Sequence, residues 1–152
     1  MLKSNKSKAF TGLVVFLGLV MTVCELPIIP DDYEPNDTFD EASVVSLGTI
    51  RATIEPEDDE DYYRFTVEGE DDITLVYDLT VPPIIQAGLN FYDSSNNLLK
   101  HSKSENPGEV ISDSITVAAG EIFVRVRAVN YEMSPVEYSL NLKTSTPVAS
   151  SE

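Results

Sequence analysis

Two acidic runs hold most of the side chains that could do chemistry in this chain. The first, DDYEPNDTFDEA, covers residues 31–42, and the second, EPEDDEDYY, covers residues 55–63. Between residues 31 and 72 the chain carries 16 acidic side chains against two arginines, Arg51 and Arg64. Like charge at this density raises the free energy of a compact fold unless a counter-ion offsets it. The two runs are therefore candidates for a cation site.

Oxygen-rich runs of this kind suit calcium, which takes roughly six to eight oxygen ligands without strict geometry. Side chains from both runs could supply them: Asp32, Glu34, Asn36 and Asp37 around Pro35, and Asp58, Asp59 and Asp61 just before a predicted strand. A short hairpin-like pair of strands between the runs would bring them together. Neither run has the glycine and the spaced final glutamate of an EF-hand loop. The alternative is two solvated loops, with Asp37 or Thr38 capping a short helix.

Side chains for catalysis are scarce. His101 is the only histidine, and its polar setting, LLKHSKS, favours an exposed hairpin residue. No serine lies in a G-x-S-x-G turn. Paired carboxylates could cleave a glycosidic bond, but the chain has no tryptophan to form a sugar platform, and its single cysteine excludes a thiolate metal site. We predict that the protein is not an enzyme.

The elements that must position the acidic runs have the patterns of β-strands. Alternating or β-branched segments recur at near-regular spacing and are bounded by turn residues: residues 44–48, 50–54, 61–67, 72–79, 89–93, 98–102, 109–117, 121–129 and 136–142. SSNN at residues 94–97 indicates a hairpin turn. Residues 38–42 indicate a short helical turn with Thr38 as N-cap and Glu41 as its capping-box partner. The pattern predicts an antiparallel β-sandwich of eight or nine strands.

The start of the chain is typical of a bacterial export signal. Lys3, Lys6 and Lys8 precede an apolar run over residues 9–23, and this run is shorter than the roughly 20 residues that a membrane-spanning helix needs. Cys24 follows directly, which resembles the lipobox of bacterial lipoproteins, in which the cysteine thiol is acylated. Val23 stands where a small residue is usual. The alternatives are an uncleaved anchor and ordinary secretion with a free thiol.

These features divide the chain into four expected parts: an export signal at residues 1–23, a lipid-anchor tether at 24–30, a domain at 31–143 and a disordered tail at 144–152. Pro27 and Pro30 stiffen the extended stretch over residues 25–33, which at roughly 3.1 Å per residue reaches no further than about 30 Å. We therefore expect a domain held close to a membrane of the bacterial cell envelope, or alternatively a secreted one. Without the signal, 26 acidic residues face seven basic ones, and this charge excludes nucleic acid as a partner.

Residues 31–143 resemble the bacterial pre-peptidase C-terminal domain. The resemblance is carried by DYEPNDTFDEA, by DEDYYRFTV, and by GEIFVRVRAVN leading to YSLNL. It implies an all-β, jelly-roll-like sandwich. Members related to the collagen-binding domains of clostridial collagenases bind calcium between the N-terminal segment and the loop before the D-Y strand. This chain carries no protease, which puts a protease-targeting role in doubt.

Carried onto matching positions, the resemblance implies these calcium ligands: Asp32, Glu34, Asn36, Asp37, Asp58, Asp61 and the backbone of Tyr62. Such a site would staple the incoming chain to the sandwich. The sequence thus predicts a non-catalytic, exported, lipid-anchored binding or adhesion module that is stabilised by calcium. Its partner would be an extracellular protein or a polysaccharide, and nothing marks an oligomer interface. The alternative is an acidic accessory subunit of the envelope that docks a basic protein partner without calcium.

Three aromatic residues are candidates for exposure. Phe123 shares its strand face with Arg125 and Arg127, Tyr92 alternates out of register with Leu89 and Phe91, and the third is Tyr131. The alternative is that they pack against the second sheet.

Overall fold

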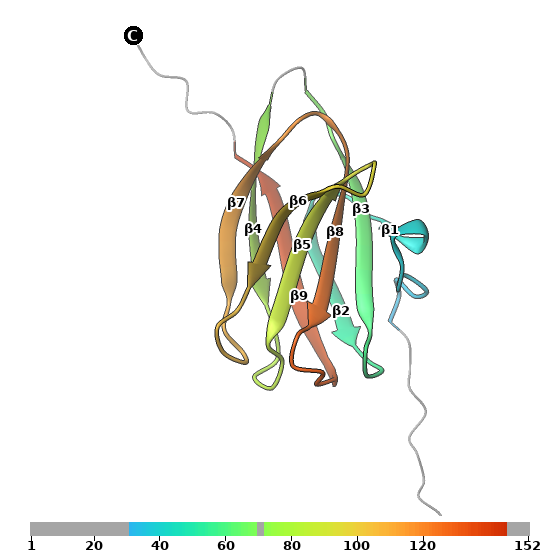
Figure 1. Ribbon diagram of the computed structural model, residues 1–152, viewed down its shortest axis with the longest axis vertical. Coiled ribbons are helices and arrows are strands. Elements are labelled where there is room, and N and C mark those ends of the chain that lie inside the picture. Colours follow the sequence, from blue (N-terminus) through green and yellow to red (C-terminus); the bar gives the residue numbers. More distant parts are fainter. Residues whose placement is uncertain (1–30, 70–71, 146–152) are drawn as a thin grey trace, which may run out of the picture.

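Nine strands form two sheets that pack face to face. A computed structural model describes residues 31–69 and 72–145. In the five-stranded sheet the strands lie in the order β1-β3-β8-β5-β6, and in the four-stranded sheet in the order β2-β9-β4-β7 (Figure 1). The predicted all-β sandwich is confirmed.

The strands fall close to the predicted segments. They are β1 (Ser43–Val44), β2 (Gly48–Ile54), β3 (Glu60–Val67), β4 (Ile73–Thr80), β5 (Ala87–Asp93), β6 (Leu98–Lys103), β7 (Ile111–Val117), β8 (Gly120–Ala128) and β9 (Ser134–Thr144). A three-residue 3-10 helix, η1 (Phe39–Glu41), precedes them. The predicted hairpin turn joins β5 and β6, where Asp93 accepts hydrogen bonds from the backbone of Ser95 and Asn97.

The core lies between the sheets because strands such as β2, β3 and β9 alternate between buried and outward-facing side chains. In β3 the buried positions are Asp61, Tyr63, Phe65 and Val67. Three tyrosines, Tyr63, Tyr77 and Tyr138, are among the largest fully buried side chains. Their hydroxyls need partners inside the sandwich. For Tyr63 and Tyr138 that partner is Asp61 of the second acidic run.

Two local expectations are corrected by the structure. Residues 44–48 and 50–54 do not form a hairpin: β1 pairs in parallel with β3 in one sheet, whereas β2 pairs with β9 in the other. Thr38 is the N-cap of η1 but its side chain caps no backbone group, and its hydroxyl instead donates to the Glu41 carboxylate at 2.8 Å. The acidic runs therefore meet where the N-terminal segment runs beside β3, and not through a hairpin turn.

Four loops gather at one end of the sandwich: residues 55–59, 81–86, 104–110 and 129–133. Backbone hydrogen bonds join the last three of these loops: the Val129 N–H donates to the Gln86 carbonyl at 2.8 Å, and the Gly108 N–H donates to the Ile85 carbonyl at 2.9 Å. The second acidic run begins in the first of these loops. We call this end the acidic-loop end.

The export signal, the tether with Cys24 and most of the predicted tail lie outside the described residues. Within residues 31–69 and 72–145, no helix is long and apolar enough to cross a membrane.

Candidate metal centre

The N-terminal segment, residues 31–42, is fastened to the sandwich at several points. Asp31 accepts hydrogen bonds from the backbone N–H groups of Thr53 and Tyr33, each at 2.9 Å. The Tyr33 ring meets the Tyr63 ring edge-on at 5.3 Å, and its carbonyl accepts from Ser43 Oγ at 2.7 Å. The segment therefore enters along the end of β2 and crosses to β3.

Farther along, η1 anchors the segment through an aromatic contact. The Phe39 ring stacks on the Phe123 ring with their centroids 4.0 Å apart. Phe123 points out of the five-stranded sheet, yet it is buried because Phe39 covers it. Residues 34–37 are thus held between two fixed points.

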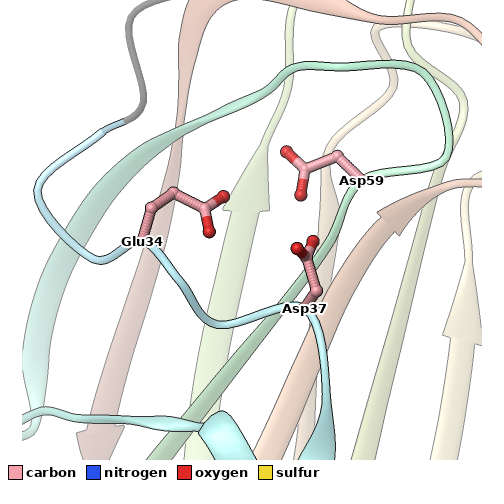
Figure 2. A group of neighbouring side chains, drawn as sticks. All are labelled: Glu34, Asp37 and Asp59. Atoms are coloured by element: carbon pink, nitrogen blue, oxygen red, sulfur yellow. The ribbon is translucent and has the colours of Figure 1, made fainter.

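Three carboxylates come together where this segment passes the start of β3. The ligand atoms of Glu34, Asp37 and Asp59 all lie within 4.8 Å of one another. Figure 2 shows the three side chains pointing toward a common space, two from the N-terminal segment and one from the loop before β3. All the side-chain donors in this cluster are oxygens, which hard cations prefer.

Two oxygen atoms in this region have no hydrogen-bond partner. Asp59 is buried; its Oδ2 accepts from the backbone N–H of Glu55 at 2.8 Å, while its Oδ1 is buried and unpaired. Asn36 is fully buried, and its Oδ1 is likewise unpaired. Buried acceptors are almost always satisfied in proteins. The unpaired Asp59 oxygen belongs to the carboxylate cluster, and Asn36 lies between Glu34 and Asp37 in the chain, so both oxygens are candidates for binding a cation.

The pKa values of two carboxyl groups in the cluster also favour a bound cation. Burial, with the Asp37 and Glu34 carboxylates nearby, raises the pKa of Asp59 to about 7. Burial, together with Asp37 and Asp31, also raises the pKa of Glu34. A carboxylate whose pKa is raised by burial and by neighbouring carboxylates has no nearby positive charge that stabilises its ionised form. A cation bound here would reverse both shifts.

Behind the cluster, Asp61 organises a buried hydrogen-bond network. Its Oδ1 accepts from Asn36 Nδ2 and from the Tyr63 hydroxyl, each at 3.2 Å, and its Oδ2 accepts from the Tyr138 hydroxyl at 2.9 Å. The two tyrosine hydroxyls are 2.7 Å apart. Burial and the charge of Asp59 raise the pKa of Asp61 to about 8. No basic side chain is among its hydrogen-bond or ion-pair partners in the described residues.

The structure places the candidate ligands in three groups. Glu34 and Asp37 lie in the carboxylate cluster, with Asn36 between them in the chain. Asp61 and the backbone of Tyr62 hold Asn36, since the Tyr62 N–H donates to the Asn36 carbonyl at 2.8 Å. Asp32 and Asp58 are exposed and lie outside the cluster.

Asp59, which the second acidic run offered as a possible ligand, is the cluster member absent from the ligand set that the resemblance implied. Asp58 adopts a positive φ of 70°, a conformation uncommon outside glycine, and the loop turns there so that Asp59 is buried and Asp58 is exposed. One signal was available in the sequence. Asp59 and Asp61 continue the every-second-residue spacing of Tyr63, Phe65 and Val67, which are buried positions of β3.

Comparisons with known proteins identify the fold and nothing finer. No family model matches the chain, and no curated protein matches it. Among solved structures it is similar to the pre-peptidase C-terminal domain of a collagenase from Bacillus anthracis, with 17% identity and a TM-score of 0.56, over 67% of this chain and 94% of that one. It also matches PliG from Aeromonas hydrophila, a periplasmic inhibitor of g-type lysozyme, at 11% identity over 67% of this chain and 97% of that one, but the TM-score is only 0.39.

Proposed function

We propose that the chain is a non-catalytic, exported binding or adhesion module whose N-terminal segment is held to the sandwich by calcium. The observation that carries the calcium proposal is the convergence of Glu34, Asp37 and Asp59 within 4.8 Å. These carboxylates come from two segments that are far apart in the chain. A cation between them would therefore join the segments.

The residues present fit calcium better than other metals. Zinc favours histidine and cysteine ligands, and the cluster has neither. Magnesium demands a near-octahedral set and keeps several waters, whereas calcium accepts an irregular set of carboxylate and amide oxygens. Glu34, Asp37 and Asp59 would hold the ion, and Asn36 carries a further unpaired buried oxygen beside them in the chain.

Calcium would act on stability and not on a reaction. It would neutralise carboxylates whose burial and mutual repulsion disfavour ionisation. A ligand present at 1,000 times its Kd stabilises a fold by about 4 kcal/mol, a large share of the roughly 5–15 kcal/mol that holds a typical domain together.

The absence of catalysis is also part of the proposal. His101 has its Nδ1 within 2.6 Å of the Asn90 amide, and its hydrogen-bond partners in the described residues include no serine or carboxylate that could complete a catalytic set. The Bacillus anthracis domain of similar fold belongs to a collagenase. By analogy, we propose a binding role for this chain.

Export and membrane attachment rest on the sequence of residues 1–30. The apolar run and Cys24 support an acylated anchor, with residues 25–30 as a short tether. Radiolabelled palmitate should be incorporated into the expressed protein, and Cys24→Ser should abolish the label. Equal labelling of the two proteins would contradict acylation at this residue.

Direct titration tests the metal proposal. Isothermal titration of the metal-free protein with calcium should give saturable binding, and Asp59→Asn should weaken it more than tenfold. An absence of binding to the parent, or equal affinity in the variant, would contradict the site.

A further inference from the structure

The outer surface of the five-stranded sheet concentrates positive charge in an otherwise acidic protein. Of the seven lysines and arginines in the described residues, four point outward from this sheet: Arg64, Lys103, Arg125 and Arg127. His101 joins them. We call this surface, carried by β3, β8, β5 and β6, the cationic face.

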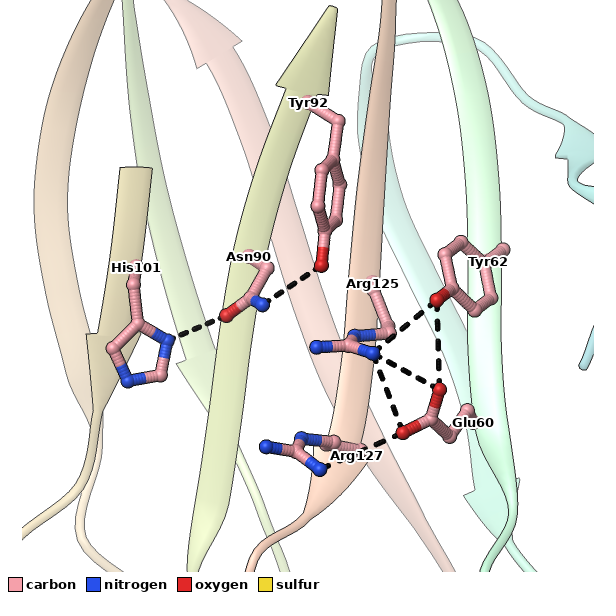
Figure 3. A network of polar contacts seen from close by, with 7 residues as sticks. All are labelled: Glu60, Tyr62, Asn90, Tyr92, His101, Arg125 and Arg127. Atoms are coloured by element: carbon pink, nitrogen blue, oxygen red, sulfur yellow. Dashed lines mark hydrogen bonds and ion pairs between the residues drawn. The ribbon is translucent and has the colours of Figure 1, made fainter. Parts of the chain in front are cut away.

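The cationic face is built from two rows that cross the sheet in register. One row runs Glu60–Arg127–Gly88–Lys103, and the next runs Tyr62–Arg125–Asn90–His101. Residues directly opposite each other on neighbouring strands point to the same side. Four strands therefore contribute to one continuous surface (Figure 3).

A hydrogen-bond network fixes the centre of this face. Arg125 donates to Glu60 at 3.1 Å and to the Tyr62 hydroxyl at 3.2 Å, and its guanidinium lies 5.7 Å from the Tyr62 ring and 5.8 Å from the Tyr92 ring. When the oxygen and nitrogen of the Asn90 amide are exchanged from their positions in Figure 3, the oxygen accepts from Arg125 at 2.7 Å and from the Tyr92 hydroxyl at 2.9 Å, and the nitrogen donates to His101 Nδ1. His101 Nε2 is then the nitrogen that carries the proton, and the residue is exposed.

The charges at the edge of the network are available to a ligand. The Arg127 side chain is 39% exposed, and its one carboxylate contact, to Glu60, is long at 3.6 Å. Lys103 is exposed and forms no ion pair with any described residue. Beside Arg127 lies a pocket of about 100 Å³ whose other lining residues include three carboxylates, Asp58, Asp59 and Glu60, so the pocket itself does not favour an anion. Arg127 and Lys103 lie on either side of Gly88, over which the Val129 side chain packs: a Cβ at this position would be 2.8 Å from Val129 Cγ1.

The opposite surface of the sandwich lacks this concentration. On the outer face of the four-stranded sheet, Arg51 and Lys143 are accompanied by Asp78 and Glu137 among serines and threonines. The net charge of the whole chain is −16. The cationic face also carries Glu60 and Glu121, the latter paired with Arg64 at 3.5 Å, but its cations outnumber these two carboxylates. An anion should therefore be repelled less by this face than by the rest of the acidic molecule.

The chemistry of the accessible atoms narrows the class of anion. Protein–protein interfaces have an apolar core, but the aromatic rings of this face are covered: Phe123 is buried under Phe39, and Tyr62 and Tyr92 are half-buried beside Arg125. The exposed large hydrophobics lie at the margins of the face: Leu98 and Leu99 on the edge strand β6, and Tyr131 in the loop after β8. The centre of the face is charged or hydrogen-bonding, which suits a hydrophilic polyanion.

We propose that the cationic face binds a carboxylate-bearing polysaccharide, with Arg127 and Lys103 as charged contacts and His101 Nε2 as a hydrogen-bond donor. The planar guanidinium of Arg127 matches a carboxylate through two parallel hydrogen bonds. This inference rests on the proposed role as a binding module and adds the surface and the chemical class of its ligand. The metal centre takes no direct part in it.

Binding of short oligogalacturonates, measured by isothermal titration, tests this inference. The parent should bind them in calcium and in chelator alike, and added salt should weaken the binding. Arg127→Gln combined with Lys103→Gln should reduce the affinity at least tenfold. Arg51→Gln combined with Lys143→Gln, which makes the same change of charge on the opposite face, should leave it within twofold.

Several results would overturn the inference. The parent could fail to bind, or the two double variants could lose affinity equally. Neutral dextran oligomers or sulfated dextran could bind as well as the uronate, or binding could need calcium but not Arg127 and Lys103. Single-stranded DNA or an acidic peptide competing as well as the uronate would reassign the ligand and also overturn it. The calcium response of thermal unfolding should persist in the Arg127 and Lys103 variant, so failure of this inference is separable from failure of the metal site.

Discussion

Asn36 and Asp61, which are 25 residues apart in the chain, are joined by a buried hydrogen bond of 3.2 Å from Asn36 Nδ2 to Asp61 Oδ1. Through this contact the acidic N-terminal segment is tied to the tyrosine hydroxyls at the centre of the sandwich. The Asn36 carbonyl adds a second link, to the Tyr62 N–H. The two acidic runs are therefore parts of one structure even before any cation is considered.

Asn36→Ala should lower the free energy of unfolding by about 1–3 kcal/mol, because it leaves a fully buried carboxylate with one donor fewer. Urea unfolding in calcium and in chelator measures this loss, which we expect under both conditions. Asn141→Ala, on the outer face of the four-stranded sheet, serves as the control and should change stability by less than about 0.5 kcal/mol. Equal stability of Asn36→Ala and the parent would contradict the role of this contact.

Without metal, the stability of the protein should fall as the pH rises from about 4 to 8. The folded-state pKa values of Asp59, about 7, and Asp61, about 8, lie above the 3.8 that is usual for an aspartate. The folded state therefore holds protons that the unfolded state has released, and each group's stabilising contribution is lost as the pH passes its folded pKa. Thermal midpoints across this range, in chelator, test the sign.

Asp59→Asn should flatten part of that pH dependence, because the amide does not titrate. Calcium should flatten it in the parent, since a bound cation favours the ionised carboxylates. A metal-free midpoint that rises between pH 5 and pH 8 would contradict the account of both aspartates.

Phe39→Ala should weaken both the fold and the calcium site. The substitution removes a ring that stacks on Phe123 at 4.0 Å and that holds the end of the segment carrying Glu34 and Asp37. We expect a loss of about 1–3 kcal/mol, less than for a fully buried phenylalanine, together with a higher Kd for calcium in titration. Phe39→Leu should retain most of the stability. An unchanged calcium affinity in Phe39→Ala would contradict the claim that η1 helps to position the calcium ligands.

The strands were predictable from sequence because their alternation is strong and their turns carry recognisable residues. Tyr63, Phe65 and Val67 mark the buried face of β3, and SSNN marks the β5–β6 turn. The pairing of β1 with β3 was not predictable. The pairing involves only two residues of β1. It depends on how the N-terminal segment packs in the folded protein and not on a local sequence pattern.

The site was predictable in outline but not in its membership. The density of charge in two runs indicated where carboxylates would gather, and Glu34 and Asp37 do so. Which aspartate of the second run would join them depended on the turn at Asp58, where φ is positive. Asp61 shares the parity of the buried tyrosines, and its role in orienting Asn36 follows from their hydroxyls, whose positions only the assembled sandwich defines.

The thermal unfolding midpoint, in calcium and in excess chelator, tests the central claim most directly. Parent protein should be compared with Asp37→Asn and Asp59→Asn, and with Asp72→Asn, an exposed aspartate outside the cluster, as the matched control. We predict that calcium raises the midpoint of the parent and of Asp72→Asn, and that it raises the midpoints of the two cluster variants little or not at all. Identical midpoints of the parent with and without calcium would contradict the claim that a cation staples the N-terminal segment to the sandwich.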